Sequence, residues 1–219
     1  MVCAGCVPKP KTTLPSDVPD TDIPAPIAAD TEWEVPSSPP EPPSVSGSLL
    51  PNGAIALGAP DAPHTLLVIT HPSCRYCKEF TRHHLPRLVD AFVSDGSLRI
   101  DLLIRPLKKY PESASLAAAA ICAAEQGRGS RVHDALADSD TLSDAALRQI
   151  SSQLTLDETA LRTCMAAPST TALVEAAAAV ADSLHADLVP TFVLDGVAST
   201  GLPEYAELRS RIDAAIGAR

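Results

Sequence analysis

The spacing of hydrophobic residues changes along the chain, and each spacing predicts a type of element. Residues 66–70 form a short, continuous apolar run with β-branched members, which is typical of a buried strand. Residues 78–95 place apolar side chains on one face of a helix, and Pro86 should kink that helix. Residues 97–105 follow the Gly96 turn and predict a second buried strand.

The segment 112–186 has a different character, because it is rich in Ala and Leu at helical spacing. Its helical pattern is interrupted at Gly127, near Asp140, near Thr155 and at Pro168, which predicts four or five helices.

Strand character returns after this helical segment. Residues 191–194 predict a strand, Asp195-Gly196 a two-residue hairpin turn, and residues 197–200 the returning strand. Pro203 opens a terminal helix that should run to about residue 216. The whole order is strand, helix, strand, helical block, strand, strand and helix. It predicts an α/β fold.

The first 52 residues lack such patterns. Twelve of the 21 prolines lie from Pro8 to Pro51, and the stretch 7–50 carries seven acidic residues against Lys9 and Lys11. Such a composition cannot bury enough apolar surface to offset the entropy of ordering the chain. We expect residues 1–52 to be a disordered, Pro-rich, acidic linker and residues 53–219 to be one folded domain.

Charge and hydropathy exclude two classes of partner. The formal net charge is −10, and no run of Lys or Arg forms a basic stripe, so we expect no nucleic-acid binding. The longest apolar run, 116–124, is about half of what a membrane-spanning helix needs.

The first six residues, Met1-Val2-Cys3-Ala4-Gly5-Cys6, end in two small residues and a cysteine. This pattern resembles the cleavage site of a bacterial lipoprotein, although no apolar segment precedes it. One interpretation is lipid attachment at Cys6, which would tether the domain to a membrane. The alternative is an accidental cysteine pair in a disordered segment.

Cys74 and Cys77 carry the candidate chemistry, because they stand between the first predicted strand and the long helix. Unpaired N–H groups and the helix dipole favour an anion at a helix start, so Cys74 is expected to be an exposed, stabilised thiolate. Arg75 should lower its pKa further. Cys77 lies one turn deeper, where it can close a disulfide or attack a mixed disulfide. A stabilised thiolate makes that disulfide more oxidising.

The motif has two other interpretations, a zinc site and a structural disulfide. His71, Cys74 and Cys77 have metal-like spacing, with His83 and His84 nearby, but a second close ligand pair is missing. A plain structural disulfide is the other alternative. We expect redox chemistry, with no metal and no cofactor.

The sequence resembles the DsbA-like thiol:disulfide interchange proteins, including their BdbD-like branch, over residues 53–216. The motifs that carry the resemblance are Gly58-Ala59-Pro60-Asp61-Ala62-Pro63, Leu85-Pro86-Arg87-Leu88, Ile104-Arg105-Pro106-Leu107, Ala123-Ala124-Glu125-Gln126-Gly127, Val132-His133-Asp134-Ala135-Leu136 and Val189-Pro190-Thr191-Phe192-Val193. The resemblance implies a thioredoxin fold with a helical insertion, at about 112–186, between the second and third core strands.

The resemblance also implies roles for particular residues. Cys74 is the exposed nucleophile, Cys77 the buried resolving thiol, and the Arg75-Tyr76 dipeptide between them modulates reactivity. Val189 and a cis Pro190 form an edge that binds extended peptides; a trans proline that begins an edge strand is the alternative.

The resemblance also bears on two further cysteines, and the sequence differs from the family pattern at some positions. Some DsbA-like proteins carry a second, structural disulfide in this helical insertion, and the resemblance implies that Cys122 and Cys164 form it here; two buried free thiols are the alternative. The Arg-Tyr dipeptide and the segment His71-Pro72-Ser73 depart from the family pattern.

The resulting hypothesis is a monomeric oxidase in the periplasm or cell envelope. It donates the Cys74–Cys77 disulfide to exported polypeptides that contain cysteine, and a membrane redox partner reoxidises it. The alternatives are a reductase or isomerase of the same fold, and a non-enzymatic adaptor that binds peptides.

Overall fold

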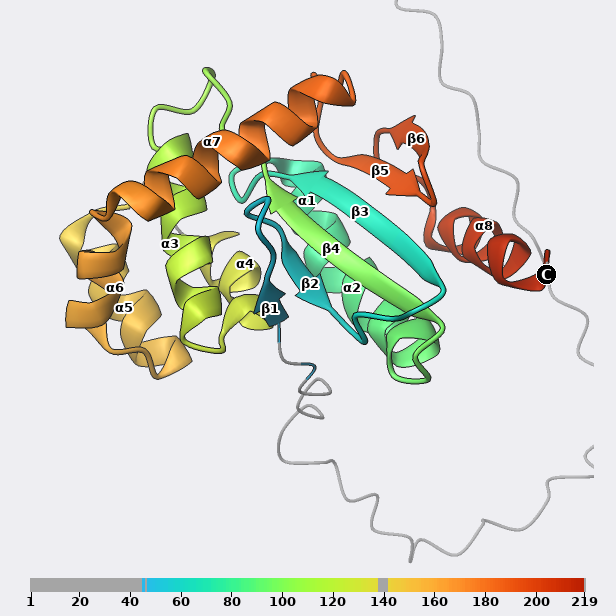
Figure 1. Cartoon of the computed structure of the whole chain (residues 1–219), viewed down its shortest axis with the longest axis horizontal. Coiled ribbons are helices and arrows are strands. Elements are labelled where there is room, and N and C mark those ends of the chain that lie inside the picture. Colours follow the sequence, from blue (N-terminus) through green and yellow to red (C-terminus); the bar gives the residue numbers. More distant parts are fainter. Residues whose placement is uncertain (1–44, 46, 138–141, 219) are drawn as a thin grey trace, which may run out of the picture. The chain divides into compact units, whose positions relative to one another are not determined.

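The structure is a computed structural model that describes residues 45, 47–137 and 142–218. Its centre is a six-stranded sheet in the order β1-β2-β4-β3-β5-β6 (Figure 1). β3 and β4 run parallel, and every other neighbouring pair is antiparallel. The strands are β1 (Gly47–Leu49), β2 (Ile55–Leu57), β3 (His64–Thr70), β4 (Leu98–Ile104), β5 (Thr191–Leu194) and β6 (Val197–Thr200).

The helices form three groups. A helical run after β3 consists of α1 (Arg75–Glu79), the π-helical segment η1 (Phe80–His84), α2 (Leu85–Leu88) and the π-helical segment η2 (Val89–Val93). The insertion between β4 and β5 contains α3 (Ser113–Glu125), α4 (Gly129–Ala137), α5 (Asp144–Leu154), α6 (Glu158–Met165) and α7 (Pro168–Ser183). The terminal helix is α8 (Tyr205–Gly217).

The two faces of the sheet are covered by different helices. Because side chains alternate along a strand, neighbouring residues of β3 pack against different helices. Leu66 and Val68 of β3 join the main core with Phe80 of the helical run. Ile69, on the opposite face, packs in a second cluster with Ala177 of α7. Each large apolar side chain buried in this way contributes about 1.5–3 kcal/mol. Both faces are therefore closed, which explains the continuous apolar run of β3.

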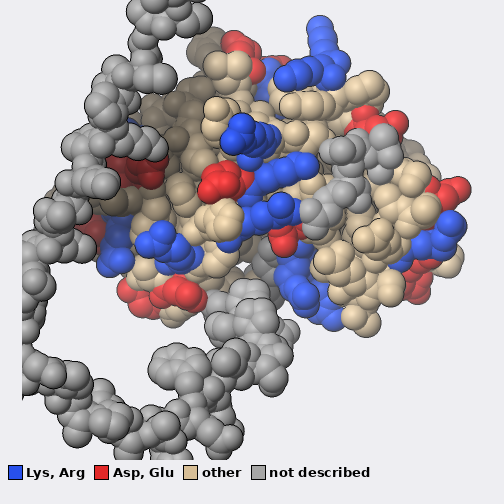
Figure 2. Space-filling model, turned by 180° about the vertical axis from the view of Figure 1, so that it is seen from behind, with Lys and Arg blue, Asp and Glu red and all other residues tan. Residues whose placement is uncertain are grey.

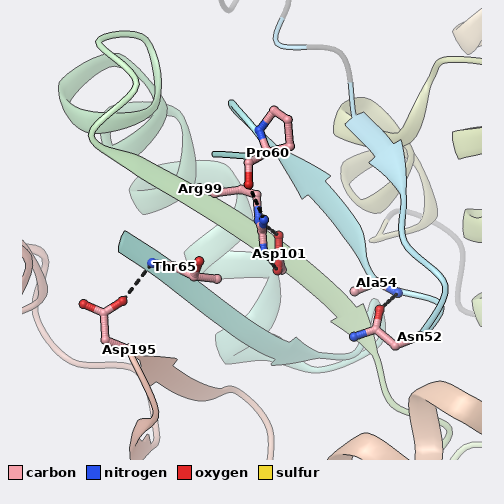
Figure 3. Close-up of polar contacts among 7 residues, drawn as sticks. All are labelled: Asn52, Ala54, Pro60, Thr65, Arg99, Asp101 and Asp195. Atoms are coloured by element: carbon pink, nitrogen blue, oxygen red, sulfur yellow. Dashed lines mark hydrogen bonds and ion pairs between the residues drawn. The ribbon is translucent and has the colours of Figure 1, made fainter. Parts of the chain in front are cut away.

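A buried ion pair stands among the apolar side chains on the α7-side face of the sheet. Asp101 of β4 is only 5% exposed, and Arg99 contacts both of its carboxylate oxygens at 2.9 and 3.0 Å (Figure 3). Arg99 also donates to the Pro60 carbonyl at 3.0 Å. The fork geometry of the guanidinium satisfies the carboxylate, so the charge is tolerated there.

The strands expected at 66–70 and 97–105, the hairpin and the helical insertion are confirmed. Asp195 and Gly196 both have positive φ, 47° and 88°, as a type I′ turn requires. The Asp195 carboxylate also accepts the N–H of Thr65 at 2.9 Å, which ties the turn to the start of β3 (Figure 3).

Other predictions need correction. β1 and β2 were not predicted, and β1 lies inside the range 1–52 that was assigned to the linker. Each has three residues, too few for an alternating pattern. In place of a simple kink at Pro86, π-helical turns flank α2; a proline lacks the N–H that an α-helical bond needs. Cys6 and most of the predicted linker lie outside the described residues.

No single helix in the described ranges has the length and apolarity to cross a membrane. α6 and α7 pass that test together, but they bend by 65° at their break.

Candidate active site

Cys74 and Cys77 lie where β3 leads into α1, as predicted. Cys74 is the N-cap residue of α1, and its carbonyl accepts the Lys78 N–H at 2.9 Å. Its own N–H donates to the His71 carbonyl at 3.0 Å, which fixes the turn between the strand and the helix. Cys77 is in the first helical turn and is fully buried. Both are free thiols in the structure.

The Cys74 thiol is far more acidic than an ordinary cysteine. A hydrogen bond from the Cys77 side chain is the main cause that lowers the pKa of Cys74 from 9.0 to about 6, against the opposing effect of burial. The backbone N–H groups of Cys77 and Tyr76, at the helix start, and the charge of Lys109 lower it further. Arg75, predicted to do this, is exposed and is not among the groups that mainly set the Cys74 pKa.

The Cys77 thiol has the opposite character. Burial raises the pKa of Cys77 far above its usual value, and its hydrogen bond to the Cys74 sulfur raises it further. A hydrogen bond between the Thr70 side chain and the Cys77 sulfur opposes both effects. At neutral pH the pair is therefore one thiolate and one thiol that donates to it.

The prediction of an exposed nucleophile is wrong, because Cys74 is only 9% exposed. The segment that precedes β5 covers Cys74. The Cys74 sulfur lies 3.4 Å from the Val189 carbonyl oxygen, to which Cys74 donates a hydrogen bond when it is a thiol. The Val189–Pro190 peptide bond is cis. The Pro190 carbonyl accepts the Gly201 N–H at 2.9 Å, which anchors this segment to the residue that follows β6.

His71 is buried beside the cysteines as a neutral imidazole. Its Nδ1 accepts the Ser73 N–H at 3.1 Å, so Nε2 carries the proton and donates to Ser113 Oγ at 2.6 Å. Burial lowers the pKa of His71 to about 4. The ring stacks on Tyr110 at 4.5 Å. Both ring nitrogens are occupied, which argues against the zinc interpretation.

A second buried histidine, His133 of α4, was not predicted to belong to the site. It is 1% exposed and lies within hydrogen-bond distance of Thr70 and Thr81, at 3.0 and 3.1 Å. Thr81 could have been found from its place one turn after Cys77. His133 gave no such signal, because it is far away in sequence.

Comparison with known proteins agrees with this geometry. The thioredoxin family pattern matches residues 51–214. The chain belongs to the thioredoxin family. No curated protein matches it.

Three solved structures show which branch of the thioredoxin family the fold resembles. A thioredoxin-like oxidoreductase from Silicibacter pomeroyi DSS-3 is 26% identical, with a TM-score of 0.64 over 76% of this chain and 94% of that one. BdbD from Bacillus subtilis in its oxidised form is 16% identical, with a TM-score of 0.66 over 79% and 98%. Wolbachia pipientis α-DsbA1 is 20% identical, with a TM-score of 0.67 over 78% and 94%. The DsbA-like resemblance is thus confirmed at the level of the fold.

This thioredoxin-family chain also has the second disulfide that the resemblance implied. Cys122 of α3 and Cys164 of α6 are bonded, with Cα atoms 5.8 Å apart. The bond joins two helices of the insertion and so cross-links that part of the fold.

An open hollow of about 360 Å³ lies beside the cysteine pair. It is lined by Ser73, Arg75, Lys78, Glu79, Arg82 and His83. Figure 2 shows the face turned away from the view of Figure 1, over which Lys and Arg side chains gather with a few acidic ones between them. Three of the side chains that line the hollow, Arg75, Lys78 and Arg82, are cationic and one, Glu79, is anionic, so the hollow itself is basic.

Among the described residues, no cluster of three or more His, Cys, Asp or Glu side chains has the arrangement of a metal site.

Proposed function

We propose that this protein is a thiol–disulfide oxidoreductase that acts as an oxidase and donates the Cys74–Cys77 disulfide to other proteins. The observation that carries the proposal is the unequal acidity of the two sulfurs. A thiolate at Cys74 stabilises the reduced form, and a stable reduced form makes the disulfide a stronger oxidant. The acidic sulfur is also the better leaving group when a mixed disulfide is resolved.

The reaction transfers two electrons from substrate to enzyme. A substrate thiolate attacks the Cys74 sulfur of the Cys74–Cys77 disulfide, and the Cys77 sulfur leaves with the electron pair and takes up a proton. The second substrate thiolate then attacks the substrate sulfur that is bonded to Cys74 in the mixed disulfide. Oxidised substrate leaves, and Cys74 remains as a thiolate.

The surface around Cys74 supports binding of an extended, unfolded polypeptide. When Cys74 is a thiolate it no longer donates to the Val189 carbonyl, which is then free to accept a peptide N–H. Tyr76 and Leu188 are 59% and 68% exposed, and both lie within two residues of this contact. Exposed apolar side chains beside a reactive sulfur suit an unfolded chain whose own apolar residues are accessible.

We further propose that the protein works outside the cytoplasm, as a monomer, on exported polypeptides. The Cys122–Cys164 disulfide supports an oxidising compartment. Reduced Cys74 and Cys77 then need reoxidation by a membrane redox partner. The segment before β1, with Cys6, is proposed to tether the folded domain, which begins with β1.

Equilibration of the Cys74–Cys77 pair with glutathione buffers tests the direction of the reaction. We expect the reduction potential of the pair to lie closer to that of the strong oxidants, about −120 mV, than to that of thioredoxin, about −270 mV. A potential near the latter refutes the oxidase and leaves a reductase or isomerase. Cys74→Ser is the control: if it turns over reduced substrate like the wild type, only a peptide-binding adaptor remains.

A further inference from the structure

A chain of buried hydrogen bonds runs from the Cys77 sulfur to His133 and back to the Cys77 backbone. The Thr70 side chain hydrogen-bonds the Cys77 sulfur, and Thr70 Oγ1 lies 3.0 Å from His133 Nε2. On the other side of the ring, His133 Nδ1 lies 3.1 Å from Thr81 Oγ1. Thr81 donates to the Cys77 carbonyl at 3.0 Å. All four residues are buried.

The directions of these hydrogen bonds define which ring nitrogen of His133 carries a proton. Thr81 gives its only hydroxyl proton to the Cys77 carbonyl, so it must accept a proton from His133 Nδ1. Burial lowers the pKa of His133 to about 4, and the ring is therefore neutral at pH 7. A neutral ring protonated on Nδ1 has a lone pair on Nε2. That lone pair faces the Thr70 hydroxyl.

Cys77 needs such an acceptor because it reacts as a thiolate but is held as a thiol. Among the buried side chains of the described ranges, the only carboxylate is Asp101. It is paired with Arg99 and lies on the opposite face of the sheet from Thr70, since the strands place Asp101 beside Leu67. His71 is also unsuitable, because both its ring nitrogens are already committed.

We propose that Thr70 and His133 form a proton relay for Cys77. When Cys77 attacks a mixed disulfide on Cys74, its proton passes to Thr70 Oγ1 while the Thr70 proton passes to His133 Nε2. The Cys77–Cys74 bond forms, the bond from Cys74 to the bound thiol breaks, and that thiol leaves with the electron pair. His133 becomes an imidazolium and returns its proton to solvent afterwards. Thr70 contacts the reacting sulfur, and His133 is a positioning residue that acts through it.

The relay rests on the proposed exchange chemistry, but it holds for an oxidase and a reductase alike. In an oxidase it serves the step in which the membrane partner's mixed disulfide is resolved. In the opposite direction the same route returns a proton to the departing Cys77 sulfur. The test below therefore does not depend on the redox potential.

Stopped-flow oxidation by the aromatic disulfide 5,5′-dithiobis(2-nitrobenzoate) separates the two steps. The experiment uses the full chain with Cys3→Ser and Cys6→Ser, so that only Cys74 and Cys77 react. Attack by Cys74 releases the first coloured thiolate, and attack by Cys77 on the mixed disulfide releases the second. The first phase reports whether the site is folded and Cys74 is reactive, and the second reports the relay.

Three variants distinguish a relay from a structural role. Thr70→Val removes the hydroxyl at nearly constant volume, while Thr70→Ser keeps it. His133→Gln keeps an acceptor oxygen that Thr70 can reach, but it cannot take a proton. We expect Thr70→Val and His133→Gln to slow the second phase by about a hundredfold and to leave the first unchanged. Thr70→Ser should retain the wild-type rate.

Two results would overturn the relay: a wild-type second phase in His133→Gln, or equal slowing of both phases in Thr70→Val with no rescue by Thr70→Ser. The proposed function fails in a different way. If the wild-type chain releases only one thiolate per molecule, Cys77 does not resolve mixed disulfides, and the exchange chemistry is refuted together with the relay.

Discussion

The hydrogen bond from Cys77 should control the acidity of Cys74, and removing it is a direct perturbation of the site. Cys77→Ala deletes the main cause of the low Cys74 pKa but keeps the backbone N–H groups of the helix start. Cys77→Ser keeps a donor of similar size. We expect the pKa of Cys74 to rise toward 9.0 in Cys77→Ala and to rise less in Cys77→Ser.

The size of the effect follows from the pKa of Cys74 in the structure. A thiol with a pKa of about 6 is mostly ionised at pH 7, whereas one at 9.0 is almost entirely protonated. Ionisation therefore stabilises the reduced protein by about 1.4 kcal/mol at pH 7, or about 30 mV in a two-electron potential. Because the folded pKa is depressed, this stabilisation grows as pH rises from about 6 to 9. It is lost as pH falls through 6.

Alkylation of Cys74 by iodoacetamide across pH measures this pKa, since only the thiolate reacts. Mass spectrometry of the Cys74 peptide keeps Cys3 and Cys6 out of the signal. The wild-type rate should titrate with a midpoint near 6, and the Cys77→Ala midpoint should be clearly higher. If Cys77→Ala still titrates near 6, the helix start and Lys109 suffice, and the hydrogen bond is not the cause.

Three other predictions concern stability and substrate binding. Replacing both Cys122 and Cys164 by Ser should lower the free energy of unfolding by about 4 kcal/mol in urea titrations, because the bond closes a loop with a sequence separation of 42. Arg99→Leu should cost about 3–5 kcal/mol by leaving the Asp101 carboxylate buried and unpaired, and adding Asp101→Leu should recover most of it. Leu188→Ser should lower kcat/KM for a reduced, unfolded protein about fivefold, for about 1 kcal/mol of lost apolar contact, without changing the rate with a small disulfide.

The parts of the fold that were predictable are those whose residues repeat a pattern over several positions. β3 and β4 have seven residues each, and the hairpin between β5 and β6 has a turn sequence that demands positive φ. β1 and β2 have neither feature, since Ile55 and Leu57 flank an alanine and β1 is Gly-Ser-Leu. Their strand geometry comes from pairing with each other and with β4, which is a tertiary effect.

The candidate site divides in the same way. The cysteine pair could be placed because a helix start after a strand is a local feature, and the backbone N–H groups do lower the Cys74 pKa. The effect predicted for Arg75 is not among the main causes of the low Cys74 pKa. Successive residues on a helix point in different directions, and Arg75 faces solvent. The covering of Cys74 by Val189 depends on a segment more than a hundred residues away.

The groups that tune the cysteines come largely from the segment that follows β4, so the insertion is part of the active site. Lys109 supplies the charge that acts on Cys74, Ser113 at the start of α3 holds His71, and His133 of α4 holds Thr70 beside Cys77. A thioredoxin-family protein with the same Cys-Arg-Tyr-Cys sequence but another insertion would keep the helix start and lose all three contacts. The reactivity of the motif therefore depends on this helical insertion as well as on the sheet. Placing the four residues Cys-Arg-Tyr-Cys in another thioredoxin-family protein should not reproduce it.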